Sequence, residues 1–223
     1  NLDNVDGTIN VLSTAIEKKV GRLIYTSTGA TWGLQHDKKI DENSESNVDD
    51  IPINYFRTKK LAENAVLQEI ERGLDAVILN PANVVGAYDR LIWSPFVQAI
   101  ANGTLSKIAG GGACFCHVEE VARAHVVAFS KGNRGQKYLL AGSNTSFYSV
   151  AKIVASLINC PPPKVSALRD THISKELFTL MSMNQVIDDS KAMNELNFKH
   201  RSIVNMYTDL VTWMVKERLI KIR

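Results

Sequence analysis

The sequence lacks the features that mark proteins with cysteine-based metal or redox sites, membrane proteins and secreted proteins. It has three cysteines among 223 residues, and no two of them have the Cys-x-x-Cys spacing of a zinc site or a redox pair. No apolar run reaches the roughly 20 residues that cross a bilayer. Asn1 to Asn4 show none of the basic and apolar character of a signal peptide. We therefore expect a cytoplasmic protein with buried, reduced thiols, without a metal and without a membrane partner.

A strong excess of charge is also missing. The 26 Lys and Arg residues and 23 Asp and Glu residues give a net charge of +3, and the basic residues are spread along the chain. Proteins that bind nucleic acids usually gather basic residues on one face, so no nucleic-acid partner is expected. What the sequence does contain is 45% hydrophobic residues. This is enough for one sizeable core and a small second lobe.

Helices and strands are predicted to alternate in the first part of the chain. Apolar residues at spacings of three and four predict helices over residues 5–19 and 55–73. Short apolar runs over 22–27 and 76–79 are typical of parallel strands that are covered on both faces. The polar segment 35–52 between them is predicted to be a loop. This order is typical of a doubly wound α/β sheet.

The predicted helix over 55–73 is amphipathic. Its apolar side chains are expected on one side, and three of them, Leu61, Ala65 and Val66, are expected to face the core; the full set is Leu61, Ala62, Ala65, Val66 and Ile70. The charged side chains of this helix are expected to point mostly outward; they are Lys60, Glu63, Glu69 and Glu71.

The chain after Pro81 is predicted to form shorter elements. The glycine run at 110–112 is interpreted as a turn, since it comes too late in the chain for a phosphate loop and no first strand precedes it. Helices are expected over 95–101, 119–130, 150–158, 188–196 and 202–219, and strands over 114–118 and 138–140.

Tyr55 and Lys59 are the strongest local signal for chemistry. Their spacing of four residues places both side chains on one face at the start of a helix. A phenol is a poor acid or base at neutral pH, but a nearby ammonium group favours its ionised form. The pair can therefore act as an acid and base, although the same spacing also arises in ordinary amphipathic helices.

Two further segments are expected at the same edge of the sheet. Thr26, Ser27 and Thr28 place hydroxyl groups at the carboxyl end of the strand over 22–27, where open α/β sheets bind their ligands. The alternative is a turn in which these side chains bond to their own backbone. Residues 79–86 leave the next strand at the same edge. Three suitable segments that meet there predict a functional site.

Several segments together resemble the extended short-chain dehydrogenases/reductases, the NAD-dependent epimerase/dehydratase family. They are residues 4–12, 22–33, 55–59, 80–86 and 116–122, in the order of the family. The overall likeness is to the dihydroflavonol-reductase-like and hopanoid-associated-epimerase-like branch. It implies a partial Rossmann-type doubly wound parallel sheet in residues 1–86 and a smaller α/β substrate lobe in residues 87–223. Segments near 114–140 are expected to return to the Rossmann domain.

The resemblance also implies a role for individual residues. Tyr55 would be the acid/base, Lys59 would hydrogen-bond the nicotinamide ribose, and Thr28 would orient the substrate oxygen. His117 is expected to support the boundary between the lobes, and Asn4 matches a family asparagine with a structural or a catalytic role. Residues implied to bind NAD or NADP are Thr26, Ser27, Tyr55, Lys59, Pro81, Asn83 and Val84.

The sequence departs from the family pattern in two places. Family members begin with a strand and a Gly-x-x-Gly-x-x-Gly turn that holds the pyrophosphate, and nothing of this kind precedes Asn1. The residues given are therefore expected to lack about the first third of a typical member and to bind dinucleotide poorly. Ala113 stands where nucleotide-sugar epimerases have an arginine that contacts the phosphates. A small substrate without a nucleotide is expected instead.

These observations predict an NAD(P)-dependent oxidoreductase that transfers hydride between nicotinamide and a small carbonyl or hydroxyl substrate. One alternative is a sugar epimerase or dehydratase of the same superfamily. Another is a non-catalytic relative that binds NAD(P) or a partner. Family members pair through the helix that follows the tyrosine, so a homodimer is a further expectation.

Overall fold

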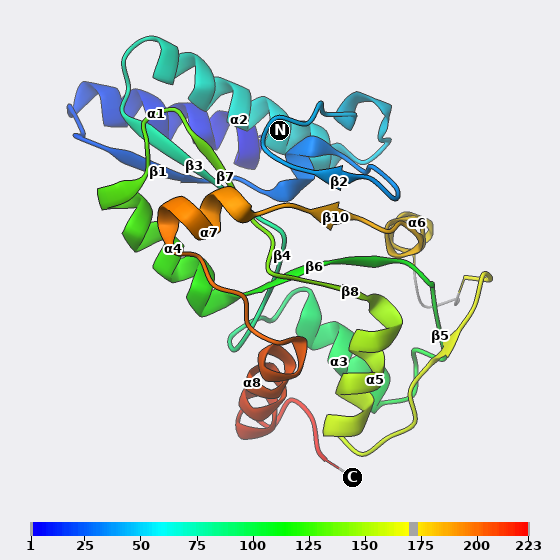
Figure 1. Ribbon diagram of the computed structural model, residues 1–223. Helices are drawn as coiled ribbons and strands as arrows, with labels where there is room; N and C mark the ends of the chain where they lie inside the picture. The colour runs from blue at the N-terminus through cyan, green and yellow to red at the C-terminus, as the bar shows by residue number, and fades with distance from the viewer. Residues whose placement is uncertain (1, 170–173, 223) are drawn as a thin grey trace.

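The first lobe is built on a parallel sheet of three strands (Figure 1). The computed structural model describes residues 2–169 and 174–222. The strands β1 (Leu23–Thr26), β3 (Ala76–Pro81) and β7 (Lys137–Leu140) lie in the order β1-β3-β7. Residues 76–79 have no exposed surface, as expected for a strand covered on both faces. This arrangement confirms the predicted α/β class; within the described residues, β1 pairs with β3 alone.

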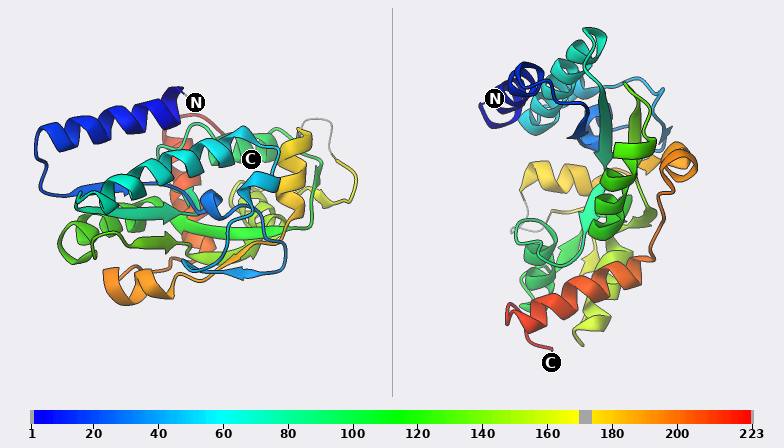
Figure 2. Two further views of the ribbon diagram at one scale, coloured as in Figure 1. Left: turned by 90° about the horizontal axis from the view of Figure 1, so that it is seen from above. Right: turned by 90° about the vertical axis from the view of Figure 1, so that its left-hand side faces the viewer.

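Helices cover both faces of this sheet (Figures 1 and 2). Ile78 of β3 packs with Leu12 and Val66 on one face, whereas its neighbour Leu79 packs with Val121 on the other. The two faces of one strand therefore contact different helices, which makes the sheet doubly wound. On the first face lie the π-helical turn η1 (Leu2–Asp6), α1 (Gly7–Glu17) and α2 (Asn54–Glu71); on the second lie α4 (Val118–Lys131) and α7 (Ser190–Leu196).

The second lobe has its own sheet and core. Its strands β4 (Asn83–Val85), β6 (Gly112–His117) and β8 (Ser143–Ser146) lie in the order β4-β6-β8, with β8 antiparallel to β6. The helices α3 (Trp93–Ala101), α5 (Phe147–Leu157) and α8 (Ile203–Lys216) pack against it. At the centre, the ring of Phe115 lies 5.1 Å from that of Trp93 and 5.9 Å from that of Phe147.

Seven short elements complete the described chain. β2 pairs with β10 and β5 pairs with β9, each in parallel. The polar segment predicted to be a loop therefore contains a short strand that the C-terminal part of the chain joins. The elements are η2 (Gly29–Trp32), β2 (Lys39–Ile40), η3 (Val48–Asp50), β5 (Lys107–Ile108), β9 (Lys164–Val165), α6 (Lys175–Ser182) and β10 (Val186–Ile187).

The chain passes between the two lobes several times. β6 belongs to the second sheet, after which α4 and β7 return to the first. α5 then lies in the second lobe, α7 packs against α4 and β7, and α8 ends the described helices in the second lobe. Each lobe therefore combines segments that are far apart in the sequence.

Two residues of α2, Leu61 and Glu63, differ from the prediction. Leu61 is 46% exposed, because the face toward the sheet is centred on Ala62 and Val66, which have no exposed surface. Glu63 was expected to point outward, but its exposure is 0%. Polar side chains from the sheet hydrogen-bond to its carboxylate and make this burial stable.

His117 connects α4 to α8. Its side chain is 2% exposed, Nδ1 accepts a hydrogen bond from the Glu119 amide at 3.3 Å, and Nε2 lies 3.2 Å from Asp209 of α8. Burial lowers the pKa of His117, and the positive charge of Arg201 lowers it further. These contacts support the structural interpretation of this residue.

The thiols of β6 are buried and unpaired. Cys114 and Cys116 are both free, and burial raises the pKa of the Cys116 thiol to about 12. Such a thiol stays protonated and packs as a small apolar group. In the described part of the chain, His, Cys, Asp and Glu side chains form no group of three or more that could hold a metal ion.

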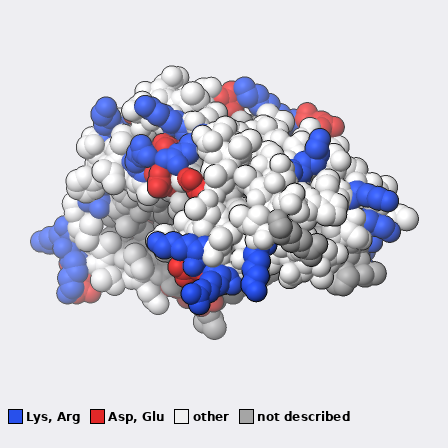
Figure 3. Space-filling view, turned by 90° about the horizontal axis from the view of Figure 1, so that it is seen from below, with Lys and Arg blue, Asp and Glu red and all other residues white. Residues whose placement is uncertain are grey.

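Charged residues on the face that carries α8 are dispersed. Figure 3 shows Lys and Arg side chains in separate groups, several of them beside Asp or Glu. An ion pair of this kind joins Arg201 to Glu119 at 2.5 Å. Across residues 2–169 and 174–222, every helix is too short or too polar to span a membrane.

Acid should weaken the fold through His117. Because its folded pKa lies below the usual 6.5, the unfolded chain takes up the proton first as the pH falls below 6.5. The free energy of unfolding should therefore fall between pH 6.5 and the folded pKa. Urea denaturation across this window should show a shallower fall in His117→Gln, and equal slopes would contradict the assignment.

Candidate active site

The candidate segments after β1 and β3 lie side by side. The Ser27 amide donates to the Leu79 carbonyl at 2.7 Å, so the two strands stay paired one residue beyond β1. A methyl group placed on Gly29 would lie 3.6 Å from the carbonyl oxygen of Pro81. The backbone that follows Thr28 is therefore in close contact with the backbone that follows β3, at the carboxyl ends of both strands.

The helix α2 is joined to these segments by Glu63. Its Oε2 atom accepts hydrogen bonds from Ser27 Oγ at 2.6 Å and from Asn80 Nδ2 at 2.6 Å. Thr31 Oγ1 lies 3.2 Å from the same oxygen. The structure thus brings together all three segments that were predicted separately, and the carboxylate that joins them was not among the predicted site residues.

Tyr55 and Lys59 lie in the first two turns of α2. The Tyr55 side chain is 50% exposed, and Lys59 is half-buried. The Lys59 ammonium lies 5.9 Å from the centre of the Tyr25 ring in β1. Burial lowers the pKa of Lys59, and the negative charge of Glu63 opposes this effect. One face of α2 therefore presents an accessible phenol and a partly desolvated ammonium group toward the end of β1.

Tyr25 is a member of this cluster that the sequence patterns did not indicate. Its hydroxyl lies 3.4 Å from Thr8 Oγ1 of α1. Burial raises the pKa of Tyr25; the contact with Thr8 lowers it, and Glu63 and Tyr55 raise it. Its position in an apolar strand gave no signal other than that of a core residue.

Asn4 is connected to the start of α2. Its Nδ2 donates to Thr58 Oγ1 at 3.0 Å, and the Thr58 hydroxyl donates to the Tyr55 carbonyl at 3.1 Å. The asparagine therefore stabilises the turn that carries Tyr55. These contacts give Asn4 a structural role, and its catalytic role stays a prediction.

The threonines at the end of β1 face different surroundings. Thr28 is half-buried, and its Oγ1 accepts a hydrogen bond from the Ala30 amide at 3.2 Å. Thr26 Oγ1 lies 2.6 Å from His125 Nε2 of α4, on the opposite face of the sheet from α2. The Ser27 hydroxyl therefore contacts α2, and the Thr28 hydroxyl lies in the turn that follows β1. The Thr26 hydroxyl contacts α4 instead.

Residues 81–84 carry the chain from the first sheet to the second. Pro81 is buried, Asn83 Nδ2 donates to the Cys114 carbonyl at 2.9 Å, and Val84 packs against the first-lobe core. The hydrogen bond of the Asn83 side chain therefore fixes this segment to β6 of the second lobe. Backbone groups, rather than side chains, are what this segment can offer to a ligand.

These groups fit the nicotinamide half of a dinucleotide. The accessible Tyr55 phenol, the Lys59 ammonium and the backbone near Pro81 can meet a nicotinamide ring and a ribose at one sheet edge. A pyrophosphate needs a row of amides at a glycine-rich helix start. Residues 1–223 contain no such turn ahead of β1.

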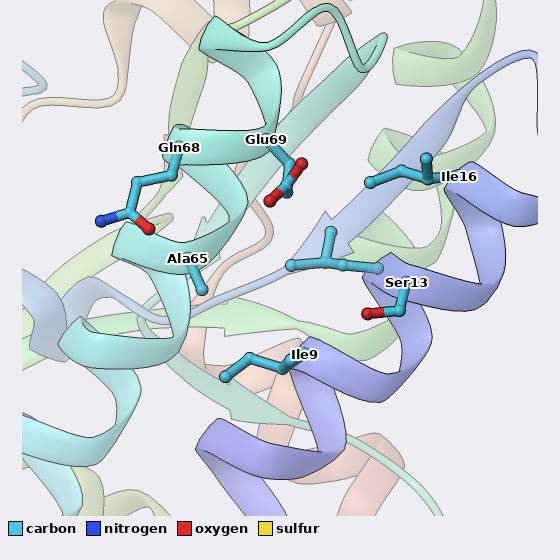
Figure 4. Close-up of a pocket in the computed structure, with 7 residues that line it drawn as sticks. Ile9, Ser13, Ile16, Ala65, Gln68 and Glu69 are labelled. Atoms are coloured by element: carbon cyan, nitrogen blue, oxygen red, sulfur yellow. The ribbon is translucent and has the colours of Figure 1, made fainter.

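A groove lies between α1 and α2, as Figure 4 shows. Its volume is about 220 Å³. Ile9, Ser13 and Ile16 line one side, and the opposite side comes from α2. Ile9 is 44% exposed and Ile16 is 46% exposed. The groove is therefore an accessible, partly apolar surface rather than a part of the polar cluster.

A second hollow of about 360 Å³ lies in the other lobe. The glycine run at 110–112, predicted to be a turn, borders it, and the Gly111 and Gly112 amides donate to the carbonyls of Met181 and Met183. None of the described residues that line it is charged; they are Ala109, Gly110, Gly111, Val165, Ser166, Ala167, Phe178 and Ser182.

Comparisons with known proteins identify the family of this chain. Residues 2–141 match the NAD dependent epimerase/dehydratase family. A Synechocystis protein named "Putative dihydroflavonol 4-reductase" is 25% identical over 98% of this chain and 71% of its own length. The crystal structure of gox2253 has a TM-score of 0.86 and 26% identity, and covers 98% of this chain and 73% of its own.

The shared fold extends to a solved complex. The Bordetella bronchiseptica enzyme WbmH in complex with NAD+ has a TM-score of 0.80 and 21% identity, and the match covers 96% of this chain and 69% of that one. At this identity the match shows a common fold.

Proposed function

The chain belongs to the NAD-dependent epimerase/dehydratase family, and we propose that it acts in that family as an NAD- or NADP-dependent reductase of small carbonyl compounds. The observation that carries the proposal is the set of hydrogen bonds from Ser27 and Asn80 to Glu63. These bonds hold the turn with Thr28 against the helix with Tyr55 and Lys59, at the sheet edge where ligands of this fold class bind.

Three side chains divide the chemistry in this proposal. When bound, the nicotinamide cofactor supplies the hydride and takes it back in the reverse direction. The Tyr55 hydroxyl donates its proton to the substrate oxygen, and the Thr28 hydroxyl orients that oxygen by a hydrogen bond. The Lys59 ammonium stabilises the phenolate that Tyr55 becomes and hydrogen-bonds the cofactor ribose.

The second lobe supports a substrate without a nucleotide. Ala113 is 6% exposed in β6, at the place where a phosphate-binding arginine would be needed. The lining of the hollow beside Gly111 carries no Lys or Arg. An apolar, uncharged surface of this kind suits the body of a small carbonyl compound better than a diphosphate.

The groove between α1 and α2 supports the expected homodimer. Ile9 and Ile16 leave apolar surface exposed along it, and Ala65 leaves room on the facing helix. Pairing two such faces around a symmetry axis would bury these residues in a bundle of four helices. The proposed assembly is therefore a symmetric dimer through α1 and α2.

Replacing Tyr55 by Phe should remove the proton donor and leave the ring in place. In the full-length protein, Tyr55→Phe should lower kcat by roughly 10²- to 10⁴-fold. The Kd for the cofactor should change little. Steady-state oxidation of NADH or NADPH with a panel of aldehydes and ketones measures kcat, and calorimetric titration measures the Kd; wild-type turnover in Tyr55→Phe would contradict the mechanism. As a matched control, Lys59→Ala should weaken cofactor binding as well as turnover.

A polypeptide of residues 1–223 should bind NAD or NADP weakly or not at all. Thr28, Tyr55 and Lys59 reach the nicotinamide half alone, and these contacts cannot replace the amides that hold a pyrophosphate. Calorimetric titration of the purified polypeptide is the measurement. Micromolar binding by a folded monomer would show that these residues contain another phosphate site.

The dimer should depend on the groove between α1 and α2. The substitution Ala65→Arg places a long charged side chain into it and should yield a monomer of 24.7 kDa. Val204→Arg, on a 49% exposed residue of α8, is the control and should leave the dimer intact. Light scattering after size-exclusion chromatography gives both masses, and a dimer of Ala65→Arg would exclude this interface.

A further inference from the structure

Glu63 places a carboxyl group in the interior of the first lobe. It lies one helical turn after Lys59 and two turns after Tyr55, and its exposure is 0%. A carboxylate is rarely buried completely unless hydrogen bonds and an opposite charge compensate for the lost water. The proposed chemistry assigns no step to this residue. Its partners therefore indicate what it does.

The partners of Glu63 also hold Thr28. The Asn80 amide has two hydrogens, and its nitrogen lies 2.6 Å from Glu63 Oε2 and 3.2 Å from the Thr28 carbonyl oxygen. The Thr31 hydroxyl lies 3.2 Å from the same carboxylate oxygen and 3.0 Å from the same carbonyl. Ser27, which donates to Glu63 at 2.6 Å, directly precedes Thr28. Among the described residues, the two donors that lie 2.6 Å from Oε2 are thus both linked to Thr28, Ser27 by the peptide bond and Asn80 by its second amide hydrogen.

Lys137 supplies the opposite charge. Its ammonium lies 3.6 Å from Glu63 Oε1 and 4.0 Å from the centre of the Trp32 ring. The lysine side chain is 20% exposed, and Trp32 is 2% exposed. The two oxygens of the carboxylate are therefore oriented differently: Oε2 faces hydrogen-bond donors that hold Thr28, and Oε1 faces a cation in β7.

We infer that Glu63 is a positioning residue, which fixes Thr28 relative to Tyr55 and Lys59 through Ser27 and Asn80. The inference rests on the proposed function, because it assigns a role in the site of that reaction. The position of the Thr28 hydroxyl relative to the substrate oxygen should then depend on the orientation of the Glu63 carboxylate. The volume that the Glu63 side chain fills should matter little.

The substitution Glu63→Gln tests this orientation with almost no change in volume. An amide that keeps its oxygen toward Ser27 and Asn80 must turn its NH2 group toward the Lys137 ammonium, where two donors oppose each other. The amide is then forced out of position. In the full-length protein, kcat should fall by roughly 10- to 100-fold, the loss that follows a small misplacement, whereas KM for NADH should stay within about threefold.

A second substitution should reverse the effect. In Glu63→Gln combined with Lys137→Met, the amide no longer faces a cation, and its oxygen can accept both hydrogen bonds again. We expect kcat to return to within about threefold of the wild type. Glu71→Gln, on an exposed glutamate of the same helix, is the matched control and should keep wild-type kcat.

The double-substitution cycle with Thr28 separates positioning from general stability. If Glu63 acts through Thr28, then adding Glu63→Gln to Thr28→Ala should cause no further loss of kcat. If the fold losses of kcat in the two single variants multiply in the double variant, the inference is overturned. Wild-type kcat in Glu63→Gln would overturn it as well. If Glu63→Gln alone fails to fold, Ser27→Ala, which removes one hydrogen bond to the carboxylate, carries the same cycle. The proposed function fails separately, if Tyr55→Phe keeps the turnover of the wild type.

Discussion

The buried carboxylate of Glu63 is the constraint on which the arrangement of the first lobe depends. An uncompensated charge at this depth would cost several kcal/mol. Its compensation comes from Ser27 after β1, Asn80 in β3 and Lys137 in β7. These groups lie within reach only when the sheet is formed and α2 is docked on it. The same contacts that stabilise the helix on the sheet therefore also assemble the proposed site.

The two lobes contribute differently to this site. The first lobe provides a rigid edge, where Thr28 follows β1, Pro81 ends the adjacent parallel strand β3, and α2 is joined to both segments. The second lobe begins directly after this edge, with Asn83 bonded across to Cys114. A substrate held in the second lobe would therefore stand next to the groups that carry the chemistry, as is usual for ligands of open α/β sheets.

Much of the fold could be predicted, because its signals are local. The apolar run at 76–79 and the helical spacing after Tyr55 each need only a few neighbouring residues to identify them. The burial of Glu63 could not be predicted in this way, because a charged residue in an amphipathic helix normally faces water and its partners come from other segments. The two-residue strands, such as β2 (Lys39–Ile40), are too short to show any periodicity.

The site was predictable in its residue types and less so in its geometry. The motif with Tyr55 and Lys59 and the hydroxyls near Thr28 follow from the sequence and the family resemblance. Strand alternation, which sends Thr26 toward His125 and Ser27 toward Glu63, became clear only when the helices on each face were known. Tyr25 gave no signal at all, since an aromatic residue in a strand is usually part of the core.

The most direct test of the proposed reductase is the fate of a labelled hydride. The full-length protein would be supplied with NADH or NADPH that carries deuterium at C4 of the nicotinamide and with a panel of small carbonyl compounds. The account predicts one equivalent of oxidised cofactor for each alcohol formed, with the deuterium on the carbinol carbon. A rearranged substrate without net oxidation of the cofactor, or an alcohol without the label, would contradict it.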